Sequence, residues 1–235
     1  MTNFIIIIPI YNEEKNLENQ ILRLSKANLL EKCLFVNDGS SDKSSKILDK
    51  HDCRKINHKR NMGVGAALRT GINYSIKNNY KITVIMAGDN QDDPNEISKI
   101  ISPIEKYNYD FVQGSRYKGK SKHIGIVWKY VSTKIYSLFF SLIATRKITD
   151  ASNAFRAFKN SFILENDLMN NNYNKYDLEP YLLLKAIKEN YKVKEVFVHK
   201  YYNKKTGYTK MRPLIDWFFI SKPLIRIIIH SIFSK

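Results

Sequence analysis

The sequence is poor in cysteine and has no long uninterrupted apolar run. Its only cysteines, Cys33 and Cys53, match neither a zinc-site spacing nor a disulfide framework. This excludes a disulfide-rich secreted domain, and we expect a reducing compartment. No stretch reaches about 18 consecutive apolar residues, so no membrane-spanning helix is expected. Met1 leads directly into an apolar segment, and we therefore expect no signal peptide.

Acidic residues are also scarce relative to basic ones. The chain carries 22 Asp and Glu against 39 Lys and Arg, a formal net charge of +17. Such an excess predicts a polyanionic partner, either nucleic acid, an anionic membrane or a phosphorylated substrate. Hydrophobic residues make up 43% of the 235 residues, which excludes a disordered chain. The length suits one α/β domain with a substantial core, or one domain with a tail.

Strand-like apolar runs alternate with helical patterns over roughly the first 115 residues. This alternation predicts an α/β fold with a mostly parallel, doubly wound sheet. In such sheets, ligands bind outside the carboxyl ends of the strands. Asp38, Asp89 and Arg116 follow three of the expected strands and should therefore lie on one rim. The expected strands are Phe4–Ile10, Cys33–Val36, Ile82–Met86, Asp110–Gln113 and an edge strand at Val193–His199, and a later helix is expected at Asp177–Lys188.

Residues 213–235 form an apolar segment that is interrupted by charges. Three basic residues, Lys222, Arg226 and His230, lie four apart and would share one helical face. This pattern predicts an amphipathic helix lying in a membrane interface, with its basic face toward anionic head groups. Pro223 is expected to break the helix near its middle. The alternative is a helix packed on the protein's own core or in an oligomer interface.

Five motifs occur in order along the chain: FIIIIPIYNEE, VNDGSSD, NMGVGAALRTG, MAGDNQDDP and GSRY. Together they resemble the family-2 glycosyltransferases with the GT-A fold, most closely the dolichol- or polyprenol-phosphate sugar synthases. The resemblance covers residues 1–212. It implies a Rossmann-like domain with a nucleotide-sugar half at 1–117 and an acceptor half with a mobile loop at 118–212, followed by the 213–235 tail.

Asp89 and Gln91 are the expected metal ligands. They stand two residues apart after a strand, and their oxygens are of the kind that Mg²⁺ or Mn²⁺ prefers. Such an ion on a sugar-nucleotide diphosphate acts as a Lewis acid and a template, which makes Asp89 a catalytic residue. Relatives often carry D-x-D, whose first position is Ala87 here, so one carboxylate is missing. The alternative is that Asp89 only caps the helix after Pro94, although Asp92 or Asp93 is better placed for that.

The resemblance also assigns residues to the donor. The segment NKKTGYTKM at 203–211 is similar to a loop that closes over the donor, which makes Lys204 and Lys210 diphosphate clamps. The alternatives are that Asn37-Asp38-Gly39 is a simple turn and that the 203–211 segment is a solvated basic loop. The residues expected to bind the donor are Pro9, Tyr11, Glu13, Asp38, Asp89, Lys204 and Lys210.

Arg116 is the second expected catalytic residue. It suits bidentate binding of a phosphate, and the resemblance makes Arg116 and Ser132 the acceptor-binding residues. A surface ion pair is the alternative for Arg116. The segment DASNAFRAF at 150–158 resembles D-x-x-S-G-F-R, where Asp150 and Arg156 are either ligand groups or a structural pair.

The expected function is inverting, metal-dependent transfer of a sugar from a GDP- or UDP-sugar to a polyprenyl phosphate. The protein would be peripheral on the cytoplasmic face of a membrane, bound to its anionic surface, with no nucleic-acid partner. One alternative is transfer to a hydroxyl of a glycan or glycolipid, with Asp177 or Glu179 as the base. A catalytically degenerate basic binding module is another. A nucleotidyltransferase also remains open, although no N-terminal G-x-G-x-R loop occurs.

Overall fold

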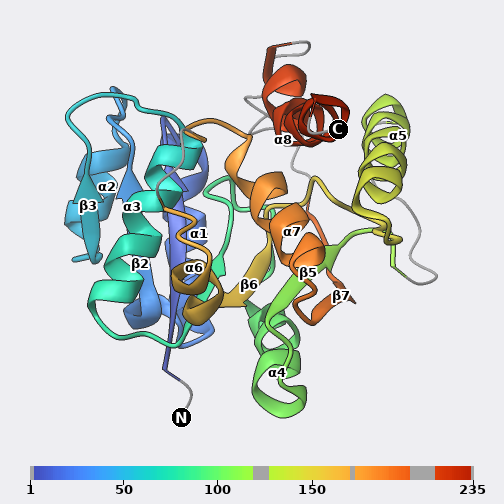
Figure 1. Ribbon diagram of the computed structural model, residues 1–235. Helices are drawn as coiled ribbons and strands as arrows, with labels where there is room; N and C mark the ends of the chain where they lie inside the picture. Colours follow the sequence, from blue (N-terminus) through green and yellow to red (C-terminus); the bar gives the residue numbers. More distant parts are fainter. Residues whose placement is uncertain (1–2, 119–126, 170–172, 202–214, 234–235) are drawn as a thin grey trace.

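A twisted seven-stranded sheet forms the centre of the computed structural model, which describes residues 3–118, 127–169, 173–201 and 215–233. The strand order is β3-β2-β1-β4-β6-β5-β7 (Figure 1). Only β6 runs antiparallel to its neighbours, β4 and β5. The predicted α/β class with a mostly parallel sheet is therefore confirmed. The strands are β1 Phe4–Ile10, β2 Cys33–Asn37, β3 Lys55–Asn57, β4 Ile82–Ile85, β5 Phe111–Ser115, β6 Arg156–Lys159 and β7 Val193–Phe197.

Helices cover both faces of the sheet and give the molecule two hydrophobic cores. β1 shows why, because its successive side chains alternate between them: Ile5 and Ile7 join one core, and Ile6 and Ile8 join the other. A strand buried on both faces needs a continuous apolar sequence, as β1 has. The α-helices are α1 Glu14–Lys26, α2 Ser44–Lys50, α3 Val64–Lys77, α4 Ile97–Tyr107, α5 Val127–Ala144, α6 Asn160–Glu165, α7 Leu178–Lys188 and α8 Ile215–Phe233, with 3₁₀ turns η1 Leu30–Lys32 and η2 Pro94–Glu96.

Two strands, β3 and β6, are not among those predicted from the sequence. Both are short and carry polar residues at their ends, so they lack the apolar pattern of a buried strand. These segments become strands because they pair with neighbouring strands. β3 pairs with β2, and β6 pairs with β4 and β5. Antiparallel β6 is inserted between two parallel strands, and it brings Arg156 into the interior, where it is 1% exposed.

The C-terminal helix α8 packs against α5 and α7 rather than standing apart as a tail. Lys222 donates a hydrogen bond to Asp177 at 3.1 Å, and the cationic groups of Lys222 and Arg226 lie over the ring of Tyr173. Lys222 and Arg226 of the expected basic face therefore contact the domain, although Arg226 is also exposed. The side chain of His230 lies outside the described residues. The expected break at Pro223 is wrong, since α8 continues through this residue.

The described exposed side chains of α5 are apolar, and those of α8 are apolar apart from Arg226. Among the side chains that the structure describes on these helices, eight large hydrophobic ones are exposed, five on α5 and three on α8. Their spacing along each helix is helical and the two helices are in contact, which makes the set a candidate surface. We call it the α5–α8 apolar face: Val131, Ile135, Leu138, Phe139, Leu142, Phe218, Ile225 and Ile229. None of the described helices meets the length and hydropathy needed to cross a bilayer.

Candidate active site

The carboxyl ends of the parallel strands define one rim of the sheet. Asp38 follows β2, Asp89 follows β4 and Arg116 follows β5, so these three residues lie on the rim that their positions after strands predicted. In Figure 1, β1 rises from the N-terminus at the lower end toward the upper end, where α8 and α5 lie. The rim and the helices α5 and α8 are therefore at the same end of the molecule.

Asp38 is buried and organises the loop after β3. Its Oδ1 accepts the Met62 amide at 2.9 Å and lies 2.7 Å from His58 Nδ1, and its Oδ2 accepts the Gly63 amide at 2.8 Å. Gly63 has φ 102°, a backbone conformation that favours glycine. Asp38 therefore has a positioning role on the rim, and its contact with a nucleotide stays a prediction.

The segment after β1 turns sharply beside this loop. Asn12 has φ 54°, and its side chain accepts the Ser41 amide at 2.8 Å. This turn leaves Tyr11 exposed on the rim and keeps Glu13 buried against Asn16. Pro9, near the end of β1, is half-buried. These positions are compatible with the predicted donor contacts of Pro9, Tyr11 and Glu13.

The predicted metal loop, residues 87–92, is braced from below by α1. Gln20 donates to the Ala87 carbonyl at 2.6 Å, and Arg23 donates to the Asn90 carbonyl at 3.0 Å. Gly88 is needed for close packing, because a Cβ there would lie 2.4 Å from the carbonyl oxygen of Pro9. The loop is thus fixed between β1 and α1, a rigid support for a ligand.

Asp89 is half-buried in this loop, and its Oδ1 accepts the Gln91 amide at 3.1 Å. Burial raises the pKa of Asp89, and the nearby positive charge of Lys200 opposes that shift. Asp93, not Asp89, caps η2, since it accepts the Asn95 amide at 3.1 Å. The alternative role of Asp89 as a helix cap is therefore wrong.

The side-chain oxygens of this loop suit a divalent ion that also binds oxygens of the bound nucleotide. Among the described residues, no group of three or more His, Cys, Asp or Glu side chains could hold a metal ion alone. Asp89 and Gln91 offer a carboxylate and an amide oxygen, and Ala87 offers no side-chain ligand. Diphosphate oxygens and water would have to complete the coordination of Mg²⁺ or Mn²⁺, both of which accept such ligands.

Lys200 lies beside the predicted metal loop, and it was not among the residues predicted from the sequence. Its side chain is 8% exposed, and its Nζ forms an ion pair with Asp92 Oδ1 at 2.7 Å. Burial alone lowers the pKa of Lys200, but the charges of Asp92 and Asp89 outweigh burial and leave the pKa raised. No sequence motif marks a single lysine after an edge strand, so only the structure identifies it.

Residues from the second half of the chain also approach the donor rim. The pKa of Tyr176 is raised to about 12, mainly by burial and further by the charges of Asp216, Glu179, Asp89 and Glu13. Burial likewise raises the pKa of Glu179, which lies 3.7 Å from Arg156. The charges of acidic groups far apart in the sequence thus act on Tyr176, and Glu179 is paired with Arg156.

Arg116 holds a buried partner. Its Nε and Nη2 donate to the two carboxylate oxygens of Asp150 at 2.7 and 2.8 Å, and Nη2 also donates to Ser152 at 2.9 Å. Asp150 is fully buried, whereas the Arg116 side chain is 18% exposed and so still reaches the surface. The alternative of Asp150 paired with Arg156 is wrong, because Arg156 instead donates to the backbone carbonyls of Glu179 and Ala154.

The next residue links Arg116 to α5. The hydroxyl groups of Tyr117 and Thr133 share a hydrogen bond of 2.7 Å, and Lys134 lies over the Tyr117 ring. Ser132 is half-buried on the same turn of α5. The two predicted acceptor residues, Arg116 and Ser132, are thus brought into one region. Lys204 and Lys210 lie outside the described residues.

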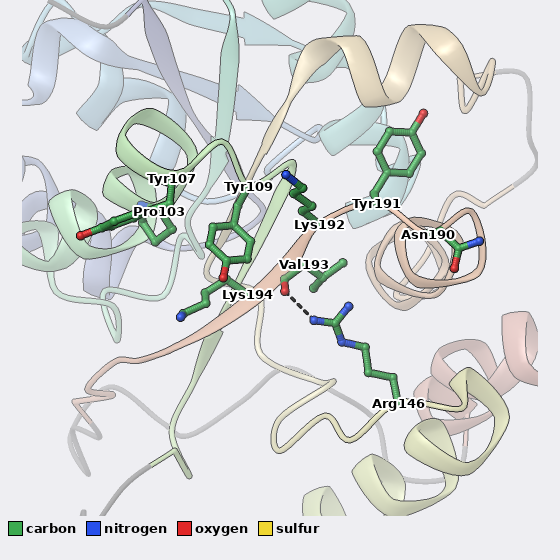
Figure 2. A pocket seen from close by; sticks show the side chains of 9 residues that line it. All are labelled: Pro103, Tyr107, Tyr109, Arg146, Asn190, Tyr191, Lys192, Val193 and Lys194. Atoms are coloured by element: carbon green, nitrogen blue, oxygen red, sulfur yellow. Dashed lines mark hydrogen bonds between the residues drawn. The ribbon is translucent and has the colours of Figure 1, made fainter.

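A separate cavity of about 730 Å³ lies away from this rim (Figure 2). It is lined by Tyr109, which precedes β5, and by Lys192 and Val193 at the start of β7. Arg146 crosses it and donates to the Val193 carbonyl at 2.6 Å. Because these residues lie at the amino ends of parallel strands, the cavity is not part of the donor site.

Comparison with known proteins identifies the family. The profile of "Glycosyl transferase family 2" matches residues 5–165. A UDP-N-acetylglucosamine–dolichyl-phosphate N-acetylglucosaminyltransferase of Methanococcus voltae is 30% identical over 174 residues, 66% of this chain and 69% of that protein. Polyprenol monophosphomannose synthase of Mycolicibacterium smegmatis is 26% identical over 214 residues, 88% of this chain and 80% of that protein.

Solved structures agree on the fold. Glucosyl-3-phosphoglycerate synthase from Mycobacterium tuberculosis, crystallised with Mn²⁺, UDP and glucosyl-3-phosphoglycerate, superposes with a TM-score of 0.72 at 14% identity. The superposition covers 97% of this chain and 79% of that one. This likeness shows the GT-A fold. The chain is therefore a glycosyltransferase that belongs to glycosyl transferase family 2.

Proposed function

We propose that this protein transfers a sugar from a nucleotide-diphosphate sugar to a polyprenyl phosphate, with inversion and with the help of Mg²⁺ or Mn²⁺. The observation that carries the proposal is the placement of Asp89 and Arg116 on one rim, with Arg116 joined through Tyr117 to α5. Donor groups and a phosphate-binding group thus face the end where the α5–α8 apolar face lies. Two relatives named as transferases to dolichyl phosphate and to polyprenol support this acceptor class.

On the donor side, Asp89 and Gln91 would hold the metal ion together with the diphosphate. The bound ion would supply charge stabilisation for the leaving nucleotide. Pro9, Tyr11 and Glu13 frame the neighbouring part of the rim, and Asp38 fixes the loop opposite them. Lys204 and Lys210 remain proposed diphosphate clamps. GDP- and UDP-sugars are both proposed as donors, since no described residue of the rim distinguishes the two bases.

On the acceptor side, the nucleophile would be a phosphate oxygen. It is already anionic at neutral pH, so the protein needs no strong base and acts mainly by positioning the reactants. Arg116 suits this task because Asp150 fixes its guanidinium in one orientation. For the alternative, a hydroxyl acceptor, Asp177 is a poor base because Lys222 and the Lys175 amide already occupy its carboxylate. Glu179, with its raised pKa, is the better base for that reaction.

We also propose that the protein binds peripherally to the cytoplasmic face of an anionic membrane, through the α5–α8 apolar face. Several large hydrophobic side chains exposed on neighbouring helices favour an interaction site. The net charge of +17 favours an anionic lipid surface over a neutral one. The structure departs from the sequence-based expectation on α8 in one respect: Lys222 donates to Asp177 of the domain, whereas it was expected on the face toward anionic head groups.

The test is a transfer assay with labelled GDP- and UDP-sugars, a polyprenyl phosphate, and Mn²⁺ or Mg²⁺. Asp89→Asn keeps the oxygen that accepts the Gln91 amide but removes the charge, and it should reduce transfer ~100-fold or more. Asp49→Asn, at an exposed ion pair with Lys55, is the matched control and should retain activity. Unchanged transfer in Asp89→Asn would rule out the metal site. Transfer only to glycan hydroxyls would favour the alternative acceptor, and no transfer at all a catalytically degenerate module.

A further inference from the structure

The segment after β7 pairs with the metal loop, residues 87–92, through its backbone. The Tyr201 amide donates to the Gln91 carbonyl at 2.9 Å, and Lys200 and Asp92 form an isolated antiparallel bridge. The contact also involves side chains, since the Tyr201 hydroxyl donates to Asp93 at 3.2 Å. This backbone pairing fixes the starting point of the Lys200 side chain directly beside the loop.

The Lys200 ammonium is buried within the donor site. Its partner Asp92 is 2% exposed, and the other oxygen of Asp92 accepts the Ala87 amide at 3.1 Å. The charge of Lys200 acts on the pKa of Asp89 and of Glu179, and Arg116 in turn acts on the pKa of Lys200. The geometry that places Lys200 at the loop is its ion pair with Asp92 and the backbone bridge between the same two residues.

The charge balance of the loop is unusual for a site that should bind a divalent cation. Ala87 removes one carboxylate from the expected ligand pattern, and Lys200 neutralises the neighbouring Asp92. Only Asp89 then remains as an anionic ligand in the loop. A site of this balance attracts a metal ion weakly, but it already holds a positive charge where a diphosphate would arrive.

We propose that Lys200 is a built-in cation of the donor site, which binds the diphosphate directly and lowers the dependence of donor binding on a metal ion. This inference rests on the proposed function, because it assumes that the donor diphosphate binds at the 87–92 loop. Asp92 orients the ammonium, and the backbone pairing of residues 91–92 with 200–201 holds it in place. A bound diphosphate would share the ammonium with Asp92.

The test measures binding of UDP and GDP by calorimetry, first in EDTA and then with Mn²⁺, and binding of Mn²⁺ alone by electron paramagnetic resonance. The wild-type protein should bind one of the nucleotides measurably in EDTA. Lys200→Met should weaken that metal-free binding roughly tenfold or more and strengthen Mn²⁺ binding by a similar factor, because the site loses one positive charge. A merely structural role would weaken both.

Two further variants make the result decisive. Lys200→Met combined with Asp92→Asn leaves no buried unpaired charge; metal-free nucleotide binding should still be weak, while Mn²⁺ affinity should return close to the wild-type value. Lys194→Met removes an exposed lysine of β7 that stacks on Tyr109, and it should change neither affinity.

Unchanged nucleotide binding in EDTA, in a folded Lys200→Met protein or in the double variant, would overturn the inference. If nucleotide binding to the wild type requires Mn²⁺ absolutely, the inference also fails, but the proposed donor site stands. If neither nucleotide binds under any condition, the proposed function fails together with it.

Discussion

Arg116 and Asp150 form a buried ion pair on the rim, and the stability of the fold depends on it. A fully buried carboxylate is stable only with a partner, and Arg116 supplies two side-chain hydrogen bonds and one backbone hydrogen bond to it. The same guanidinium is the group proposed to bind the acceptor phosphate. Its removal would therefore affect the stability of the fold as well as acceptor binding, and the two effects must be separated.

A double-mutant cycle separates them. Arg116→Met should reduce the free energy of unfolding by roughly 3–5 kcal/mol, because it leaves Asp150 charged, buried and unpaired. Arg116→Met with Asp150→Asn should cost less, since no charge is left behind. In the double variant, the KM for a polyprenyl phosphate should rise while nucleotide affinity is kept. Urea unfolding and steady-state kinetics measure these effects; additive losses of stability, or a defect confined to the donor, would contradict this dual role of Arg116.

Helices and strands were predicted correctly where the segment's own sequence pattern is sufficient to specify its secondary structure. β1 was predicted with its observed bounds and α7 within one residue, because a continuous apolar run and a helical repeat describe them completely. β3 and β6 were missed because their strand pairing comes from neighbours. α8 was predicted as a helix, but its orientation was not, since Asp177 and Tyr173 decide which side faces the domain.

The exposed side of α5 gives the prediction at this scale. Leu138→Glu with Leu142→Glu should abolish flotation of the protein with anionic liposomes, because both side chains are more than half exposed and would have to bury a charge in lipid. Leu164→Glu on α6 is the matched control: its leucine is 61% exposed but lies outside the α5–α8 apolar face, so binding should persist. Equal loss in both proteins, or no loss in either, would speak against this face as the lipid-binding surface.

For the whole molecule, the two cysteines report on the integrity of the core. Cys33 and Cys53 both belong to the core on the α1 and α4 side of the sheet. Burial raises the pKa of both thiols, that of Cys53 to about 11. Neither forms much thiolate near neutral pH in the folded state, and both should be inert there.

We therefore expect a thiol reagent to modify the folded protein slowly at pH 7–8 and rapidly once denaturant unfolds it. The sign of the pH dependence follows from the raised pKa: the unfolded thiols ionise first, near ~8.5, so stability is retained below that pH and falls as the pH rises toward about 11. Labelling rates and urea midpoints between pH 7 and 10 measure both effects. Fast labelling of the native protein, or stability that increases over this range, would contradict the buried placement of the thiols.

The amino-acid sequence by itself determined five of the seven strands, the mostly parallel arrangement of the sheet and the rim that carries Asp38, Asp89 and Arg116. This was possible because local apolar patterns define strands, and parallel strands necessarily end at a common edge. Only the tertiary structure decided three pairings. Lys200 pairs with Asp92, Arg116 pairs with Asp150, and Lys222 of α8 pairs with Asp177. These pairings join residues that are 34 to 108 positions apart, so they depend on packing of the whole chain rather than on any local pattern.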